Sequence, residues 1–303
     1  MNTPTLLTWS EKDSERSALW RSDQNLPARV VLADDTLTAD AAYRLACEGT
    51  GLLWRGDFQN ARQLLQAMAR RIDKPQKAKR KKADAAAPMP GAAFHTHRQA
   101  QAQRTRVLSQ ILIELNGDYG ITLRRAPDAK QACAQAFGPA NGQSSVISLR
   151  ALQGVIGAFE WRKNGVEVPA LGEDLRIHPH YGVFSPVRGE YVALVNEAPL
   201  PAVLKAHPVA FDIGAGTGVL SAVLARRGAS QVVATDMAER ALVCAHDNLQ
   251  RLGLQNQVQL LQADLFPPGQ AALVVCNPPW LPARPTSVLE QAVYDEGSQM
   301  LKG

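Results

Sequence analysis

Apolar side chains recur at helical spacing through much of the first 175 residues, which predicts a mainly helical N-terminal region. Thr38 can cap a helix that stops at Gly49, and Asp57 can cap a second one. Five apolar residues would lie on one face of the second helix: Phe58, Ala61, Leu65, Met68 and Ile72. Residues 1–73 are therefore expected to be helical, and their apolar stripes are expected to pack in a core.

A break in this pattern separates the first helical region from a second one. Residues 74–93 lose all periodicity and consist largely of Lys, Ala, Pro and Gly, which is typical of a flexible linker. Residues 94–175 then predict three more helices. The first ends at Gly117, and its apolar face is formed by Val107, Leu108, Ile111, Leu112 and Leu115. Two further helices would span residues 128–137 and 148–164.

From residue 176 onward the pattern changes to short apolar runs separated by Gly and Pro. Residues 177–184 and 191–195 have β-like patterns on either side of a Pro/Gly turn. Four strands then alternate with helices, at residues 209–213, 231–235, 258–261 and 272–276. This alternation implies a parallel, doubly wound sheet, so we predict an α/β fold of Rossmann-like topology for residues 176–303.

The composition suits one or two folded domains and excludes several other classes. The chain has 303 residues, of which 46% are hydrophobic and 20% charged, and this rules out a disordered chain, a collagen and a disulfide-stapled miniprotein. No uncharged apolar run reaches the ~18 residues of a membrane span, and the N-terminus does not resemble a signal peptide. We expect a cytoplasmic protein without a membrane partner.

The net charge of +5 comes from one short run rather than from the whole chain. Residues 74–82 carry six cations, and the other 27 Lys and Arg residues stand against 28 Asp and Glu residues. Such a run is most often a solvated linker, although it can also bind RNA or an acidic partner. The near-neutral remainder argues mildly against a broad phosphate-binding face.

Cysteine and histidine spacing gives no sign of a disulfide or a metal site. The four cysteines have no CxxC or other ligand spacing, which favours free thiols in a reducing compartment. The close pairs His95/His97 and His178/His180 have no Cys or carboxylate beside them at zinc-site spacing. We therefore expect no metal.

Three glycines follow the first of the four predicted strands at a spacing that suits a ligand-binding turn. Gly214, Gly216 and Gly218 allow the backbone to turn sharply and a ligand to approach it closely. A dinucleotide fingerprint would need its third glycine at position 219, which is Val219. Together with Asp212, the tighter spacing resembles the first motif of class I S-adenosylmethionine-dependent methyltransferases. A tight strand-to-helix turn without a ligand is the alternative.

Two carboxylates stand where this resemblance requires them, at the ends of the next two strands. Asp236 lies ~20 positions beyond the glycine turn, and an acidic residue there can bind both ribose hydroxyls. In the resembled family an acidic residue at the position of Asp264 takes the adenine amino group of the cofactor. Upstream, Phe184 and Pro186 loosely resemble a stretch that lines the methionine end of the cofactor, although a simple hairpin fits equally well.

The fourth strand ends in Asn277-Pro278-Pro279-Trp280, which is the most specific signal in the chain. It resembles the (Asn/Asp)-Pro-Pro-aromatic signature of methyltransferases that act on planar nitrogen in adenine, guanine and glutamine. Such a nitrogen is a poor nucleophile because its lone pair is delocalised. The Asn277 oxygen and the Pro278 carbonyl can accept hydrogen bonds from the NH2 group and orient that lone pair. Pro279 stiffens the loop, and Trp280 offers a flat face for stacking.

The resemblance implies an S-adenosylmethionine-dependent N-methyltransferase that transfers its methyl group in one direct displacement. Its acceptor would be a base of rRNA or tRNA or a protein glutamine, and a small aromatic amine stays open. The rival interpretation is a non-catalytic interaction protein. The resembled fold has seven strands and only four are predicted here, so we also expect a C-terminally truncated form, or an inactive fragment, of a longer methyltransferase.

Overall fold

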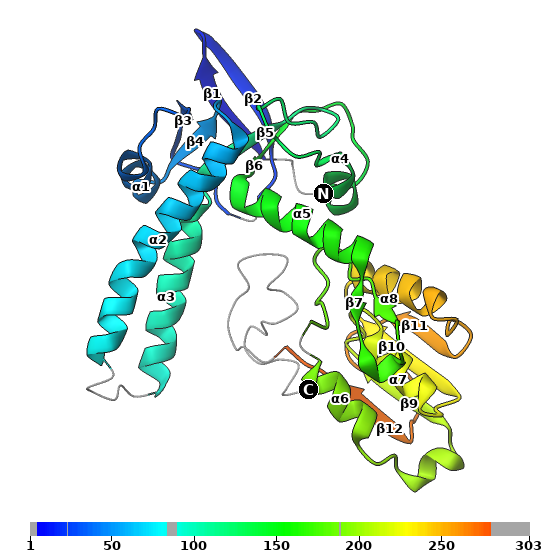
Figure 1. The fold of residues 1–303 in the computed structure, drawn as a ribbon. Helices are drawn as coiled ribbons and strands as arrows, with labels where there is room; N and C mark the ends of the chain where they lie inside the picture. The colour runs from blue at the N-terminus through cyan, green and yellow to red at the C-terminus, as the bar shows by residue number, and fades with distance from the viewer. Residues whose placement is uncertain (1–4, 23, 84–89, 188, 280–303) are drawn as a thin grey trace. The chain divides into compact units, whose positions relative to one another are not determined.

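The computed structural model describes residues 5–22, 24–83, 90–187 and 189–279 (Figure 1). The chain folds as two compact units, Met1–Ile156 and Gly157–Gly303, and helix α5 (Leu149–Asn164) crosses the boundary between them. Each unit is built on a β-sheet with helices, so the predicted α/β class is confirmed. No helix in the described part of the chain is long and apolar enough to cross a membrane.

A six-stranded mixed sheet forms the centre of the N-terminal unit, in the order β1-β2-β6-β5-β4-β3. The bounds of its strands are Leu6–Glu11 (β1), Ser14–Trp20 (β2), Arg29–Ala33 (β3), Thr50–Trp54 (β4), Ile111–Leu115 (β5) and Ser145–Ser148 (β6). The pairs β1/β2 and β5/β6 are antiparallel, whereas the other neighbours run parallel. Strands β4, β5 and β6 are almost wholly buried, so the core of this unit lies against them.

Besides α5, the described helices of this unit are α1 (Ala39–Cys47), α2 (Phe58–Ala83), α3 (Pro90–Leu108) and α4 (Lys130–Phe137). The predicted caps Thr38 and Asp57, and Ser148 at the start of the helix predicted over 148–164, each accept a backbone N–H from the first turn, at 3.3, 2.8 and 3.1 Å. These short polar side chains satisfy donors that have no partner inside the helix. The starts of α1, α2 and α5 are therefore where the sequence predicts them.

The expectation of a mainly helical N-terminal region is wrong, because this unit holds six strands. In β1, Leu7 and Trp9 are buried whereas their neighbours are exposed, and this period of two is that of a half-buried strand. The apolar run 107–115 is not one helix, since α3 ends at Leu108 and β5 begins at Ile111. A fully buried strand is apolar on both faces, and periodicity alone cannot distinguish it from a helix.

The predicted linker, residues 74–93, is also corrected by the structure. Residues 74–83 continue α2 and residues 90–93 begin α3, while residues 84–89 lie outside the described part of the chain. Loss of hydrophobic periodicity shows that a segment buries no apolar face, but Lys, Arg, Gln and Ala remain good helix formers. The basic run therefore lies on a helix.

Four parallel strands form the sheet of the C-terminal unit, in the order β11-β10-β9-β12. Their bounds are Val209–Ile213 (β9), Gln231–Asp236 (β10), Val258–Gln262 (β11) and Leu273–Cys276 (β12). Helices α7 (Val219–Arg226) and α8 (Glu239–Arg251) connect the first three strands, as predicted. The apolar core of this unit joins α7 to β9 and β10.

Upstream of this sheet, the two predicted β-like segments differ from the structure. Of residues 177–184 only Ile177 is in a strand, in the two-residue β8 (Arg176–Ile177), which pairs with β7 (Val166–Glu167). Residues 191–195 lie inside a helix, α6 (Glu190–Glu197). Aromatic and β-branched residues favour strands only weakly, and burial of Val192 against the sheet's helical layer overrides that preference here.

Candidate active site

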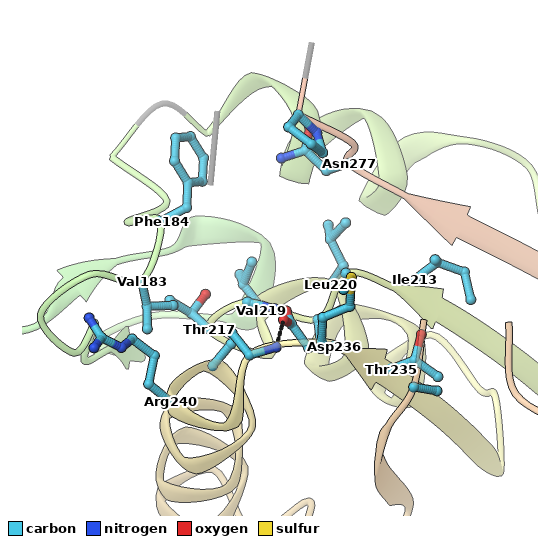
Figure 2. A pocket seen from close by; sticks show the side chains of 18 of the residues that line it. Val183, Phe184, Ile213, Thr217, Val219, Leu220, Thr235, Asp236, Arg240 and Asn277 are labelled. Atoms are coloured by element: carbon cyan, nitrogen blue, oxygen red, sulfur yellow. Dashed lines mark hydrogen bonds between the residues drawn. The ribbon is translucent and has the colours of Figure 1, made fainter. Parts of the chain in front are cut away.

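A cavity of about 720 Å³ opens at the carboxyl ends of the parallel strands of the C-terminal unit (Figure 2). Ligands of open α/β sheets bind at this edge, because the loops that follow adjacent strands diverge there. Seven of the predicted site residues line it: Phe184, Gly214, Gly216, Asp236, Asp264, Asn277 and Pro279. The sheet thus brings together residues that are almost 100 positions apart in the sequence.

The glycine turn between β9 and α7 is held open by left-handed backbone. Gly214, Gly216 and Gly218 have φ angles of 78°, 53° and 77°, which residues with a Cβ rarely adopt. The N–H groups of Gly214 and Ala215 both donate to the Thr235 carbonyl, at 2.9 and 2.8 Å. These bonds anchor the turn to the end of β10 and leave its outer edge against the cavity.

Gly218 does not line the cavity but lets α7 approach α8. A Cβ built on Gly218 would lie 3.1 Å from the Cβ and 3.2 Å from the Cα of Ala245. This is tighter than ordinary van der Waals contact, so a side chain at this point would force the two helices apart by a few tenths of an ångström. Gly218 is also the N-terminal cap of α7, which begins at Val219.

Asp236 is the carboxylate that faces the glycine turn. It lies half-buried at the end of β10, where Oδ2 accepts the Gly216 N–H at 3.0 Å and Oδ1 accepts the Ala238 N–H at 2.9 Å. Each carboxylate oxygen can accept more than one hydrogen bond, so both retain capacity for a ligand hydroxyl. The two backbone bonds fix the orientation in which this carboxylate meets a ligand.

Asp264 lies in the loop after β11, where its side chain is exposed at the cavity. The next residue, Leu265, has a φ of 64°, and its carbonyl accepts the Thr235 hydroxyl at 2.6 Å. A left-handed leucine is unfavourable, and this bond to β10 helps to hold it. The loop is thereby fixed beside the end of the neighbouring strand.

Asp212 lies below the cavity and is not among the residues that line it. Its side chain is 1% exposed, and Oδ2 accepts the Ser221 hydroxyl at 2.5 Å, which joins β9 to α7. Its Oδ1 has no hydrogen-bond partner in the described part of the chain. Burial raises the pKa of Asp212 to about 6, because the charged form loses its hydration.

Asn277 faces the cavity from the end of β12. It is half-buried, and no residue in the described part of the chain is hydrogen-bonded to its side-chain amide. Figure 2 shows Asn277 and Phe184 on one side of the cavity, with Asp236 and Arg240 across from them. Pro278 and the buried Pro186 are not among the lining residues, and Trp280 lies outside the described residues.

Several lining residues were not predicted from the sequence. Tyr191 of α6 packs against Phe184 with ring centroids 6.3 Å apart, and burial raises the pKa of Tyr191 to about 12. Met237 is 67% exposed beside Asp236, and Arg240 is exposed at the start of α8. Of these residues, only Met237 and Arg240 could have been predicted from the sequence, because they follow closely after Asp236 at the end of a predicted strand.

Asn248 supports the site from behind and was also missed. Its side chain is buried on α8, where Nδ2 donates to the Thr217 carbonyl at 3.0 Å and Oδ1 accepts the His178 N–H at 2.7 Å. A lone asparagine three positions from Ala245 on the apolar face of a helix is the signal for this role. In the described part of the chain no cluster of His, Cys, Asp and Glu side chains could hold a metal ion.

A parallel sheet, a left-handed glycine turn and a carboxylate at the neighbouring strand end define an α/β domain of the kind that binds a nucleoside-containing cofactor. Residues 174–302 match the family described as the methyltransferase small domain. The match covers most of the C-terminal unit but less than half of the chain, so this unit is similar to methyltransferase small domains. The resemblance noted in the glycine turn and in the Asn-Pro-Pro segment is confirmed at the level of this domain.

The chain is similar to curated methyltransferases with different targets. The release factor glutamine methyltransferase of Gloeobacter violaceus is 34% identical over 143 residues, which cover 46% of each chain. The tRNA1(Val) (adenine(37)-N6)-methyltransferase of Glaesserella parasuis is 38% identical over 73 residues, 23% of this chain and 31% of that protein. The ribosomal protein L11 methyltransferase of Caldanaerobacter subterraneus is 29% identical over 125 residues, 35% and 40% of the two chains. The chain thus spans less than half the length of each of these relatives.

Proposed function

We propose that the C-terminal unit is an S-adenosylmethionine-dependent methyltransferase that acts on a planar nitrogen. The observation that carries this proposal is the composition of one cavity, since Asn277 and Pro279 line the same space as Gly216 and Asp236. One side of that space offers groups that suit a nucleoside. The other side offers oxygen acceptors that suit an NH2 group.

The residues of the cavity fit this cofactor. Its volume of about 720 Å³ lies within the usual range of small-molecule sites. Asp236 is fixed by two backbone N–H groups and retains acceptor capacity for ribose hydroxyls, while Gly214 and Gly216 place no side chain in the way. Exposed Met237 offers an apolar surface to a base, and we assign the adenine amino group to Asp264.

The residues of the chain would bind and orient the acceptor. When bound, the cofactor supplies a methyl group on positively charged sulfur. The Asn277 side-chain oxygen and the Pro278 carbonyl would accept hydrogen bonds from the acceptor NH2, so that its lone pair points at that methyl group. These acceptors also stabilise the positive charge that grows on nitrogen in the transition state, after which a proton leaves to solvent. Stacking by Trp280 remains a prediction.

Two acceptor classes present the required NH2 group on a planar carbon. Among the relatives, one enzyme is named for a release factor glutamine and another for a tRNA adenine. An amide and an amino-purine share the delocalised lone pair that the Asn-Pro-Pro segment would reorient. We therefore propose a glutamine side chain or an RNA base as the acceptor.

The first test is S-adenosylmethionine binding to the full chain by calorimetry. Asp236→Asn replaces one acceptor oxygen with a donor, and it should weaken binding by at least about tenfold, because hydrogen bonds to a charged group contribute about 1.5–3 kcal/mol. The matched control is Asp174→Asn, an exposed aspartate whose φ of 60° asparagine tolerates. Absence of binding in the wild-type chain, or equal binding by both variants, would contradict the cofactor site.

The second test separates binding from methyl transfer. Asn277→Ala should leave S-adenosylmethionine affinity within about threefold, since Asn277 lies across the cavity from Asp236. It should abolish transfer of labelled methyl groups to unmodified tRNA or to a glutamine peptide. Asn256→Ala, which removes an exposed asparagine, serves as the control. Full turnover by Asn277→Ala would refute the role of this residue.

A further inference from the structure

One wall of the cavity is formed by a short segment between β8 and α6. We call residues 178–184 the strap, and its last three residues, Gly182, Val183 and Phe184, line the cavity. Figure 2 shows Val183 and Phe184 at the edge of this space. The strap belongs to no helix or strand, so no regular set of backbone hydrogen bonds holds it. Its position therefore depends on contacts with the elements beneath it.

Helix α8 holds the strap through apolar and polar contacts. Val183 packs against Ala241 and Cys244 in a buried apolar cluster. The His180 N–H donates to Cys244 Sγ at 3.3 Å, and the His180 carbonyl accepts the Val183 N–H at 3.1 Å. The strap begins at the backbone groups that Asn248 binds. These contacts place the cavity-lining end of the strap directly above α8.

The imidazole of His180 makes a further contact with α8, through Asp247. Its Nε2 lies 3.2 Å from Asp247 Oδ2, and the side chain is 12% exposed. Arg162 of α5 donates to the same oxygen at 3.3 Å, while His246 Nδ1 lies 3.7 Å from the other one. On the strap itself, His178 Nδ1 is 2.6 Å from the Arg162 carbonyl. Asp247 thus has a permanent counter-charge in Arg162, and a neutral His180 with its proton on Nε2 suffices as the second donor.

A second proton on His180 opposes this arrangement. Burial lowers the pKa of His180 because the charged form loses its hydration, and the positive charges of Arg162 and Arg251 lower it further. Asp247 acts in the opposite direction without reversing the shift. The Cys244 thiol against the strap stays neutral, since burial raises its pKa to about 12. Retention of the strap is therefore complete above ~6.5, the ordinary pKa of histidine, and weakens as the pH falls below it.

We propose that His180 is a positioning residue for cofactor binding: as a neutral imidazole it holds the strap on α8, and its protonation releases the strap. The inference rests on the proposed function, because it takes the cavity as the S-adenosylmethionine site. A released strap would withdraw Val183 and Phe184 from the cavity, and the cofactor would lose their apolar surface. Cofactor affinity should then depend on pH through a residue that does not line the cavity.

The test measures S-adenosylmethionine affinity of the full chain by calorimetry at about pH 7.5 and about pH 5.5. In His180→Gln the amide nitrogen can replace Nε2 as a donor but does not titrate, and His207→Gln removes an exposed histidine as the matched control. On acidification, wild type and control should lose at least about threefold more affinity than His180→Gln. Titration of Asp212 occurs in every variant and cancels in this comparison.

A second variant separates positioning by a hydrogen bond from the mere presence of a side chain. His180→Ala removes the donor to Asp247, so at about pH 7.5 it should bind S-adenosylmethionine at least about threefold more weakly than wild type. At the same pH His180→Gln should bind within about twofold of wild type, because it restores a donor. Equal affinities of the Gln and Ala variants would overturn the role of the hydrogen bond.

Hydrogen exchange tests the strap without the cofactor. In peptides covering residues 178–184, protection corrected for the intrinsic rate should fall at the lower pH in wild type and control but not in His180→Gln. Equal loss of protection, or of cofactor affinity, in wild type and His180→Gln would overturn the inference. A wild-type chain that bound no S-adenosylmethionine while exchange behaved as expected would instead contradict the proposed function and leave the pH response of the strap in place.

Discussion

Asn248 is expected to determine whether the glycine turn keeps its shape. The side chain is 1% exposed on α8, yet it is hydrogen-bonded to backbone groups on two other segments. Its Oδ1 accepts the His178 N–H at 2.7 Å, and its Nδ2 donates to the Thr217 carbonyl at 3.0 Å and to the His178 carbonyl at 3.3 Å. Thr217 lines the cavity, so Asn248 connects the turn to the segment that precedes α6.

The loss of stability caused by replacing Asn248 can be worked out from the backbone groups that would lose their hydrogen-bond partner. Asn248→Ala leaves the half-buried His178 N–H and the buried Thr217 carbonyl without this partner, at about 1–3 kcal/mol each, so the free energy of unfolding should fall by about 2–6 kcal/mol. Asn248→Asp keeps an acceptor for His178 but turns a second oxygen toward the Thr217 carbonyl. Burial and that carbonyl would raise the pKa of the introduced carboxyl. Its destabilising effect should therefore shrink as the pH falls through that raised value.

Hydrogen exchange of the turn and urea unfolding provide the assay. The chain has two units and need not unfold in one step, so exchange in peptides covering residues 213–220 reports the local change directly. Faster exchange there, together with a lower urea midpoint, is expected for Asn248→Ala but not for the exposed control Asn256→Ala. A loss of less than about 1 kcal/mol with unchanged exchange in the turn would refute the reasoning.

Two further predictions concern the same unit. Because burial raises the pKa of Asp212 to about 6, the folded form binds a proton more readily than the unfolded chain. Unfolding free energy should thus rise as pH falls from about 7 toward 4, and urea titrations of Asp212→Asn should lack this rise. Gly218→Ala should cost more stability than Gly228→Ala, since both have positive φ but only Gly218 meets Ala245. Equal thermal shifts would disprove the packing argument.

The C-terminal sheet could be predicted because the sequence near each strand and turn is enough to determine its local structure. Buried parallel strands are apolar on both faces, and the glycine turn and Asp236 occur at the strand ends where backbone geometry and ligands require them. Asn277 could be placed for the same reason. Tyr191 could not, because its segment has strand-like residues and becomes helical through packing against α7.

The strands of the N-terminal sheet could not be predicted from hydrophobic periodicity, and the physical reason differs from that for Tyr191. Its central strands are so completely buried that β5 shows no alternation, and the adjoining end of α3 extends the apolar run into an apparent helix. For the basic run the error is the reverse: residues 74–83 are predicted to be part of a linker but belong to helix α2. This run has no apolar face, so hydrophobic periodicity says nothing of its backbone, although its residues favour a helix.

The strand that carries Asn277 is held less firmly than the strands that carry the glycine turn and Asp236. In the described part of the chain β12 pairs only with β9, and its four residues are half-buried or exposed, whereas β9 and β10 are almost entirely buried. Substitutions around β12 should therefore cost little folding energy, while those around the turn cost much. Within the described residues, the glycine turn and Asp236 therefore rest on well-buried strands, whereas Asn277 follows a strand that packs less closely.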